Sequence, residues 1–162
     1  MSAPLTAQQE RILTAVQGYL ELGMPKEALR ELAGLSEESQ QAPEAIEARI
    51  VVLLALRRWS AAATQARKLC RLLPHFPTGF IHLAYCQHEK GHTERARETL
   101  LNGPPALRKE STYFYNLACY DAVLGDLSSA RLNLARCIHL DRRFIEFAKS
   151  DPDLSALHSE LT

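Results

Sequence analysis

Apolar residues recur along the chain at the i, i+3, i+4, i+7 spacing of amphipathic helices, and the predicted helices come in pairs. In the first helix Ile12 and Val16 share one face, and Thr6 stands where a side chain caps the helix start. Gly23 ends this helix, because a residue without a Cβ adopts the left-handed conformation at least cost. Pro25 then suits the first turn of the partner helix. The pattern predicts a helix–turn–helix hairpin.

The hairpin pattern repeats every 34 residues. Small helix residues keep this period at Ala28, Ala62, Ala96 and Ala130. Turn glycines keep it at Gly23, Gly91 and Gly125, and Arg57 occupies the remaining turn position. A small residue facing a large one lets two helices pack closely, and a period of this length is typical of stacked hairpins. The sequence therefore predicts an all-α protein built from antiparallel helix pairs.

The repeats predict a single domain over 1–162 with a separate C-terminal cap. After about residue 141 the period fails, although Phe144, Phe147 and Ala148 still share one helical face. A terminal repeat leaves an apolar face open, and stacked arrays need a cap with a polar exterior. The predicted repeats and cap are about 9–42, 43–76, 77–110 and 111–141, followed by 142–160.

These residues resemble the tetratricopeptide repeat (TPR) family. The best match carries Phe114, Leu117, Ala118, Gly125 and Ala130 at the family's aromatic, leucine-small, turn and small-residue positions. The sequence departs from the family pattern at Arg57, Gly103 and Arg142. The resemblance covers roughly 8–142 and implies a right-handed superhelix, or α-solenoid. It also implies that the first helix of each pair lines a concave groove that binds extended or helical peptides, without catalysis.

The predicted groove surface follows the first helices, on the side away from the packing positions. Tyrosines are favoured there, because they offer a large contact area and a hydroxyl at low entropic cost. The alternative is that these residues pack on one another, on the cap or on a second copy of the chain. The candidate groove residues are Leu13, Gln17, Leu20, Val51, Leu54, Ile81, His82, Tyr85, Tyr115, Asn116 and Cys119.

The chain of 162 residues carries 19 basic and 19 acidic side chains, so its formal net charge is zero. Zero net charge gives no overall attraction to nucleic acid or to an anionic membrane. A local basic patch offers salt-dependent contact with nucleic acid or an acidic partner, although such a run is more often a solvated face. The patch comprises Arg57, Arg58, Arg67, Lys68 and Arg71.

Nothing in the pattern favours an enzyme, a metal site or a cofactor. His82 and Cys86 lie one helical turn apart, but His88 and His92 do not converge with them on one point, as zinc ligands must. The four cysteines form no CxxC pair, which favours reduced thiols in a cytoplasmic protein, and no apolar run is long enough to span a bilayer.

The sequence therefore predicts a non-enzymatic adaptor or chaperone-like protein that binds an extended or amphipathic segment of a partner protein. Two alternatives stay open. One is a homo-oligomeric scaffold, such as a homodimer, in which the apolar strip is the self-contact. The other is binding of nucleic acid or an acidic partner through the basic patch.

Overall fold

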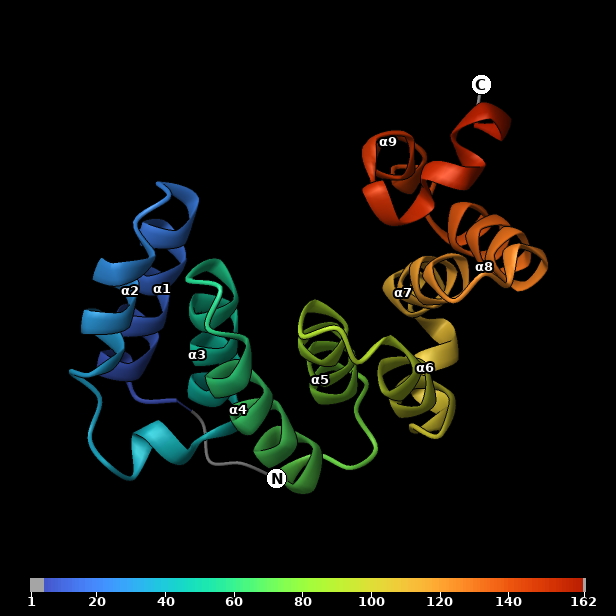
Figure 1. The fold of residues 1–162 in the computed structure, drawn as a ribbon. Coiled ribbons are helices and arrows are strands. Elements are labelled where there is room, and N and C mark those ends of the chain that lie inside the picture. The colour runs from blue at the N-terminus through green and yellow to red at the C-terminus, as the bar shows by residue number, and fades with distance from the viewer. Residues whose placement is uncertain (1–4, 162) are drawn as a thin grey trace. The chain divides into compact units, whose positions relative to one another are not determined.

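The 34-residue period takes the form of helix pairs in three dimensions. A computed structural model describes residues 5–161, and every regular element within that range is a helix (Figure 1). The helices form two compact units, of which unit 1 ends at Pro74 and unit 2 begins at His75. The all-α fold of paired helices is thereby confirmed. The expectation of a single domain over 1–162 stays a prediction. The boundary between the two units lies where Pro74 and Pro77 cannot donate backbone hydrogen bonds to extend a helix.

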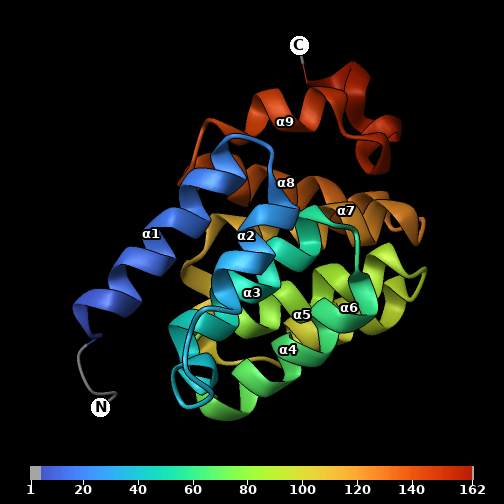
Figure 2. The ribbon, with the colours of Figure 1, turned by 90° about the vertical axis from the view of Figure 1, so that its left-hand side faces the viewer.

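Unit 1 contains two hairpins. Its elements are α1 (Ala7–Glu21), α2 (Pro25–Leu32), the short 3₁₀ helix η1 (Ser39–Gln41), α3 (Pro43–Ala55) and α4 (Trp59–Leu72). The helices of each hairpin pack against each other, and α2 also packs against α3 (Figures 1 and 2). A continuous apolar core therefore joins both hairpins within unit 1.

Local sequence signals set the ends of these helices. Thr6 forms a capping box with Gln9: its hydroxyl accepts from the Gln9 backbone N–H, and its own N–H donates to Gln9 Oε1 at 2.6 Å. Gly23 has a φ of 69° in the turn before α2. Arg57 occupies the equivalent turn of the second hairpin, and its φ of 55° is in the region that favours glycine. Its guanidinium lies 5.9 Å from the Trp59 ring centroid.

Unit 2 contains the other two hairpins and a C-terminal extension. Its elements are α5 (Thr78–Glu89), α6 (Thr93–Leu101), η2 (Pro105–Lys109), α7 (Ser111–Val123), α8 (Leu127–Leu140), α9 (Phe144–Ser150) and the 3₁₀ helix η3 (Pro152–Glu160). Asp126 caps α8 by accepting from the Ser129 backbone N–H at 3.0 Å. No helix within residues 5–161 is both long enough and apolar enough to cross a membrane.

The periodic alanines are fully buried between the helices of both units. Ala28, Ala62, Ala96 and Ala130 are all 0% exposed. Each lies early in the second helix of its hairpin, where the absence of a longer side chain lets the two helices approach. The repeat period therefore marks where helices touch.

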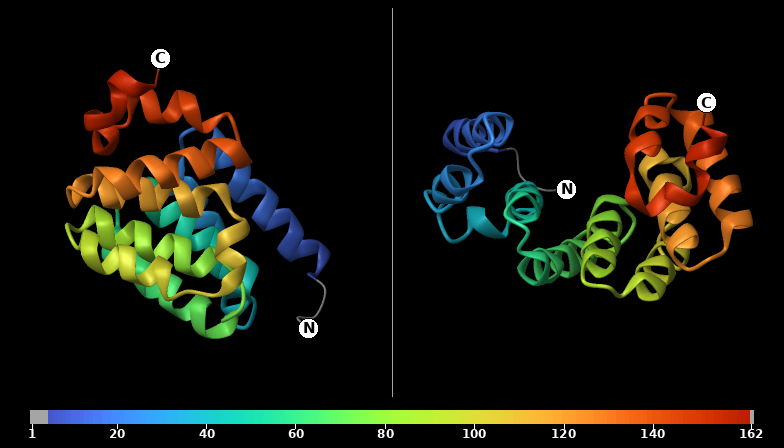
Figure 3. Two further views of the ribbon diagram at one scale, coloured as in Figure 1. Left: turned by 90° about the vertical axis from the view of Figure 1, so that its right-hand side faces the viewer. Right: turned by 45° about the horizontal axis from the view of Figure 1, so that its top comes forward.

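The non-repeating C-terminal segment (residues 144–160) packs against α7 and α8 (Figure 3). Ala148, Leu154 and Leu157 are buried and belong to the same core cluster as Tyr113 and Leu117 of α7. Because α7 and α8 form the last repeated hairpin, this segment covers its open apolar face. Two short helices form it, α9 and η3.

Candidate functional site

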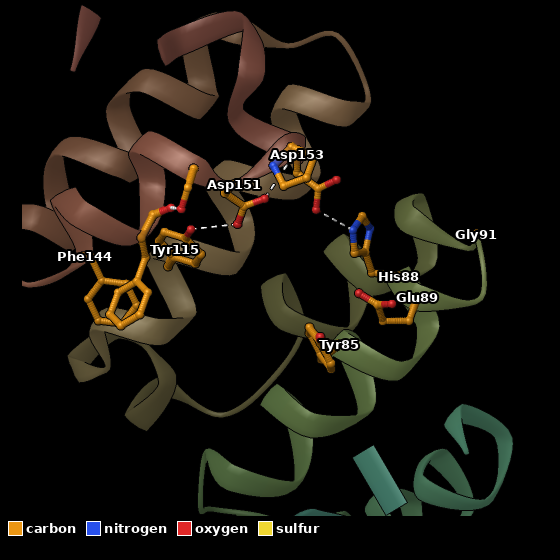
Figure 4. Close-up of a pocket in the computed structure, with 11 residues that line it drawn as sticks. Tyr85, His88, Glu89, Gly91, Tyr115, Phe144, Asp151 and Asp153 are labelled. Carbon is orange, nitrogen blue, oxygen red and sulfur yellow. Dashed lines mark hydrogen bonds and ion pairs between the residues drawn. The ribbon is translucent and has the colours of Figure 1, made fainter. Parts of the chain in front are cut away.

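A large cavity of unit 2 lies between the first helices of its hairpins and the C-terminal segment (Figure 4). Its volume is about 900 Å³. We call it the unit 2 pocket, and it is lined by Tyr85, His88, Glu89, Gly91, Tyr115, Phe144, Phe147, Ser150, Asp151, Pro152 and Asp153. Tyr85, His88 and Glu89 come from α5, Tyr115 comes from α7, and the C-terminal segment supplies the rest apart from Gly91.

Two aspartates position the C-terminal segment against the hairpins. Asp151 caps η3 by accepting from the Asp153 backbone N–H at 3.0 Å, and its Oδ2 accepts from the Tyr115 hydroxyl at 2.7 Å. Asp153 Oδ2 lies 2.8 Å from His88 Nε2 (Figure 4). His88 Nδ1 lies 3.0 Å from the hydroxyl of Thr93. The two carboxylates thus link the C-terminal segment to α7 and α5 respectively.

Aromatic rings form one wall of the pocket. The ring centroids of Tyr115 and Phe144 are 4.9 Å apart, and those of Phe144 and Phe147 are 5.8 Å apart. Such tilted pairs are favourable arrangements of aromatic quadrupoles. Phe147 nevertheless remains 62% exposed. The wall therefore offers apolar surface that unit 2 does not itself cover.

The hydroxyl and thiol groups around the pocket are held in their neutral forms. Burial raises the pKa of Tyr115 far above its ordinary range, and the hydrogen bond to Asp151 raises it further. Burial likewise raises the pKa of the Cys119 thiol, with the negative charges of Asp151 and Asp153 adding to the effect. The pKa of Tyr85 is raised by burial and then by the charge and hydrogen bond of Glu89. These groups favour neutral hydrogen bonding over nucleophilic chemistry.

Three potential metal-ligating groups meet beside the pocket. One ligand atom each from Cys119, Asp151 and Asp153 lies within 4.8 Å of the others. All three side chains already have protein partners: the Cys119 thiol donates to Asp151 Oδ2 at 3.7 Å, and Asp153 bonds to His88. A metal binds the thiolate, whereas the raised pKa of Cys119 favours the thiol. We therefore assign this cluster to docking of the C-terminal segment.

The sequence-predicted groove residues of unit 2 have different positions in the structure. Tyr85 and Tyr115 line the unit 2 pocket, and Ile81 and His82 are half-buried on α5. Burial lowers the pKa of His82. Asn116 and Cys119 are buried, and the Cys119 thiol contacts Asp151 of the C-terminal segment. Packing on the cap, the alternative considered above, describes Cys119.

The sequence prediction did not include the C-terminal half of the pocket. Phe144 and Phe147 share one helical face that the sequence assigns only to the cap, and Asp151 and Asp153 carry no predicted binding role. These residues lie beyond the last repeat, so the period assigns them no position. The available signal was the Ser150-Asp151-Pro152 turn, which combines a capping side chain with a helix-starting proline.

The predicted groove residues of unit 1 lie on α1 and α3. Leu13, Leu20 and Leu54 are half-buried, and Leu13 and Leu20 pack against the unit 1 core. Gln17 is exposed and donates to Glu21 at 3.0 Å, and Val51 is 38% exposed. Leu13 and Leu20 thus contribute to the unit 1 core, whereas Gln17 and Val51 are exposed on the surface, and a binding role for this face stays a prediction.

The basic patch lies on α4 and the turn before it. Arg57, Arg58, Arg67 and Arg71 are exposed, while the ammonium group of Lys68 donates to Gln41 Oε1. The patch is therefore mainly a solvated surface of unit 1.

Comparisons with known proteins agree with the helical-repeat fold. No family model matches the chain, and no curated protein matches it in sequence. A solved structure of MamA (residues 41 to the end) from Desulfovibrio magneticus RS-1 is similar, with a TM-score of 0.72 and 18% identity over 98% of this chain and 93% of that one. A MamA RS-1 double mutant gives the same TM-score and identity over 98% and 94%.

PcrH, solved in complex with the chaperone binding region of PopB, is similar with a TM-score of 0.57 and 23% identity. The match covers 79% of this chain and 95% of PcrH. At these identities the likeness concerns the fold, and it places the chain among TPR-like helical-repeat structures.

Proposed function

We propose that this protein is a non-enzymatic interaction module that binds an extended or amphipathic segment of a partner protein. The observation that carries the proposal is the unit 2 pocket, with its volume of about 900 Å³ and its four aromatic side chains. The first helices of the hairpins, with the C-terminal segment, form the binding surface. Tyr85 and Tyr115, expected from the sequence to anchor a ligand, are two of these aromatics.

The surface chemistry of the pocket supports this proposal. Aromatic residues are enriched at protein interfaces, since they bury a large area while losing few side-chain rotamers. Phe147 supplies such area at the pocket entrance, and a partner that covers it gains hydrophobic free energy without reorganising the core. PcrH is an example of a similar fold solved with a segment of another protein, although its partner indicates nothing about the partner of this chain.

Affinity capture with matched surface variants tests the proposal. Phe147→Asp places a charge on the pocket wall, whereas Leu140→Asp changes a side chain on α8 that is 49% exposed and does not line the pocket. Val51→Asp probes the corresponding face of unit 1. Circular dichroism and thermal denaturation first establish that each variant keeps the fold.

The proposal expects a partner protein that the wild type and Leu140→Asp capture and that Phe147→Asp loses. Capture that is equal for wild type and Phe147→Asp contradicts it. Recovery of the protein alone, with a concentration-dependent mass in light scattering, supports the homo-oligomeric scaffold instead.

A further inference from the structure

The charges that line the unit 2 pocket have one sign. Among its 11 lining residues are three carboxylates, those of Glu89, Asp151 and Asp153, and no lysine or arginine. His88 is the one basic side chain of the lining, and it is already bonded to Asp153. A ligand that enters the pocket therefore meets a negative field from α5 on one side and from the C-terminal segment on the other.

Glu89 differs from the two aspartates because its carboxylate is exposed and has no ion-pair partner within the described part of the chain. Asp151 and Asp153 are engaged with Tyr115 and His88, whereas Glu89 is exposed and forms no ion pair with any cation within residues 5–161. It lies one helical turn after Tyr85 on α5, and both side chains line the pocket, so the carboxylate is on the same face as an aromatic ring. Figure 4 shows Tyr85 and Glu89 together on α5, across the pocket from Tyr115 and Phe144. Glu89 is thus a carboxylate without a cationic partner at the pocket edge.

The aromatic rings add a second attraction for a cation. The face of an aromatic ring carries negative electrostatic potential and attracts ammonium and guanidinium groups within about 6 Å of the ring centroid. Tyr85, Tyr115, Phe144 and Phe147 place four such rings in the same pocket as the carboxylates. A purely apolar ligand would instead take water from the carboxylates without compensating their charge, which is unfavourable.

We propose that the unit 2 pocket binds a positively charged side chain, an arginine, carried by the partner segment. The planar guanidinium stacks on an aromatic face while its N–H groups donate to the carboxylate of Glu89, a combination that a lysine ammonium provides less well. This inference rests on the proposed function and adds the chemical character of the partner: an arginine flanked by residues that contact Phe144 and Phe147.

A pair of short peptides tests the charge requirement directly. The probe is an acetylated and amidated five-residue peptide with arginine at its centre and alanine elsewhere, and its control has citrulline, the neutral analogue of arginine, in that position. Titration is followed in ¹⁵N–¹H spectra of the whole protein. We expect the arginine peptide to shift signals of α5 and α9 with an affinity at least about tenfold above that of the citrulline peptide.

Two glutamate variants distinguish binding of the arginine peptide in the pocket from attraction to negative charge elsewhere on the surface. Glu89→Gln removes the carboxylate that has no cationic partner and is expected to lower the affinity for the arginine peptide about fivefold to tenfold. Glu98→Gln changes an exposed glutamate of α6 outside the pocket and should leave this affinity unchanged. Equal affinity of the two peptides, absence of saturable shifts, or equal loss in both variants overturns the inference.

Capture of the partner by the Phe147→Asp and Glu89→Gln variants distinguishes a failure of this inference from a failure of the proposed function. Loss of the partner from Phe147→Asp and weakening by Glu89→Gln support both. Loss from Phe147→Asp with full binding by Glu89→Gln keeps the interaction module and overturns the arginine pocket. Full binding by both variants overturns both proposals.

Discussion

Unit 1 and unit 2 are built from the same helix pair, yet their interiors differ. In unit 1 every buried side chain is apolar, whereas all four buried polar or charged residues within residues 5–161 lie in unit 2, namely Gln87, Thr93, Asn116 and Asp121. The Asp121 carboxylate, 2% exposed, accepts from Arg97 Nε at 2.5 Å and from the Asn133 amide at 2.8 Å. Buried polar groups are tolerated when they are hydrogen-bonded, so unit 2 depends on specific pairing as well as on apolar burial.

The two units also differ at their C-terminal ends. Unit 1 ends with its second hairpin at Pro74, whereas the non-repeating segment of unit 2 folds back onto α7 and α8 and provides most of the pocket lining. The repeated hairpins form the scaffold of both units, and the irregular segment adds six of the 11 residues that line the unit 2 pocket. Variants that separate these contributions test the comparison.

The largest effect is expected from the anchor of the C-terminal segment. Leu154 is 0% exposed in the unit 2 core, so Leu154→Ala should lower the free energy of unfolding by about 3 kcal/mol through lost burial and the resulting cavity. Urea denaturation followed by circular dichroism measures the change, with exposed Ser155→Ala as the neighbouring control. A change below about 1 kcal/mol would mean that the segment is not an integral part of unit 2.

A smaller loss is expected when the polar interior of unit 2 is broken. Asp121→Ala removes the buried acceptor of Arg97 and Asn133 and should cost about 2 kcal/mol, because both hydrogen bonds are lost. Asp121→Asn, which keeps one acceptor oxygen, should cost less. If both variants are as stable as wild type in the same denaturation experiment, the polar network does not distinguish unit 2 from unit 1.

Thiol labelling compares the units without mutation. Cys70 of unit 1 is half-buried, whereas Cys86, Cys119 and Cys137 of unit 2 are buried. Mass spectrometry should find Cys70 labelled at least about tenfold faster than the other three thiols, which corresponds to a difference of about 1.4 kcal/mol in the activation free energy of labelling. Burial raises the pKa of Cys70 to about 11, so its rate should rise with pH from 8 to 10 as the reactive thiolate forms. Equal labelling of all four thiols would contradict the closed interior of unit 2.

The smallest effect concerns the turns. Arg57 occupies with a positive φ the position that Gly125 holds in unit 2. Arg57→Gly should therefore stabilise the protein by no more than about 1 kcal/mol, reduced by the lost contact with Trp59. Thermal denaturation measures the difference, and Gly125→Ala should change stability in the opposite direction. Destabilisation by Arg57→Gly would show that the Trp59 contact outweighs the backbone strain.

Most of the scaffold could be predicted from the sequence because its signals are local or periodic. The alanine period identified fully buried helix positions, and Gly23 and Thr6 marked helix ends where the structure has them. The division at Pro74 was not predicted, since a repeat period describes each hairpin and its neighbour but not where one compact unit ends.

The lining of the unit 2 pocket was predicted only in part. Tyr85 and Tyr115 line it, and both were predicted groove residues because they lie on first helices at positions that the period defines. Asn116 and Cys119 were placed on the same face but are buried, and the C-terminal segment that contacts Cys119 lies outside the repeat. The aromatic and acidic residues of that segment line the pocket only because of tertiary packing, which no local pattern specifies.

Hydrogen exchange of both units in the presence and absence of the captured partner tests most directly whether the irregular part of unit 2 provides the binding site. Backbone amides of α5, α9 and the start of η3 should exchange more slowly in the complex, because the partner covers the pocket that they line. Those of α1 and α3 should be less affected. Protection confined to α1 and α3, with α5 and α9 unchanged, would place binding on unit 1 and contradict the assignment.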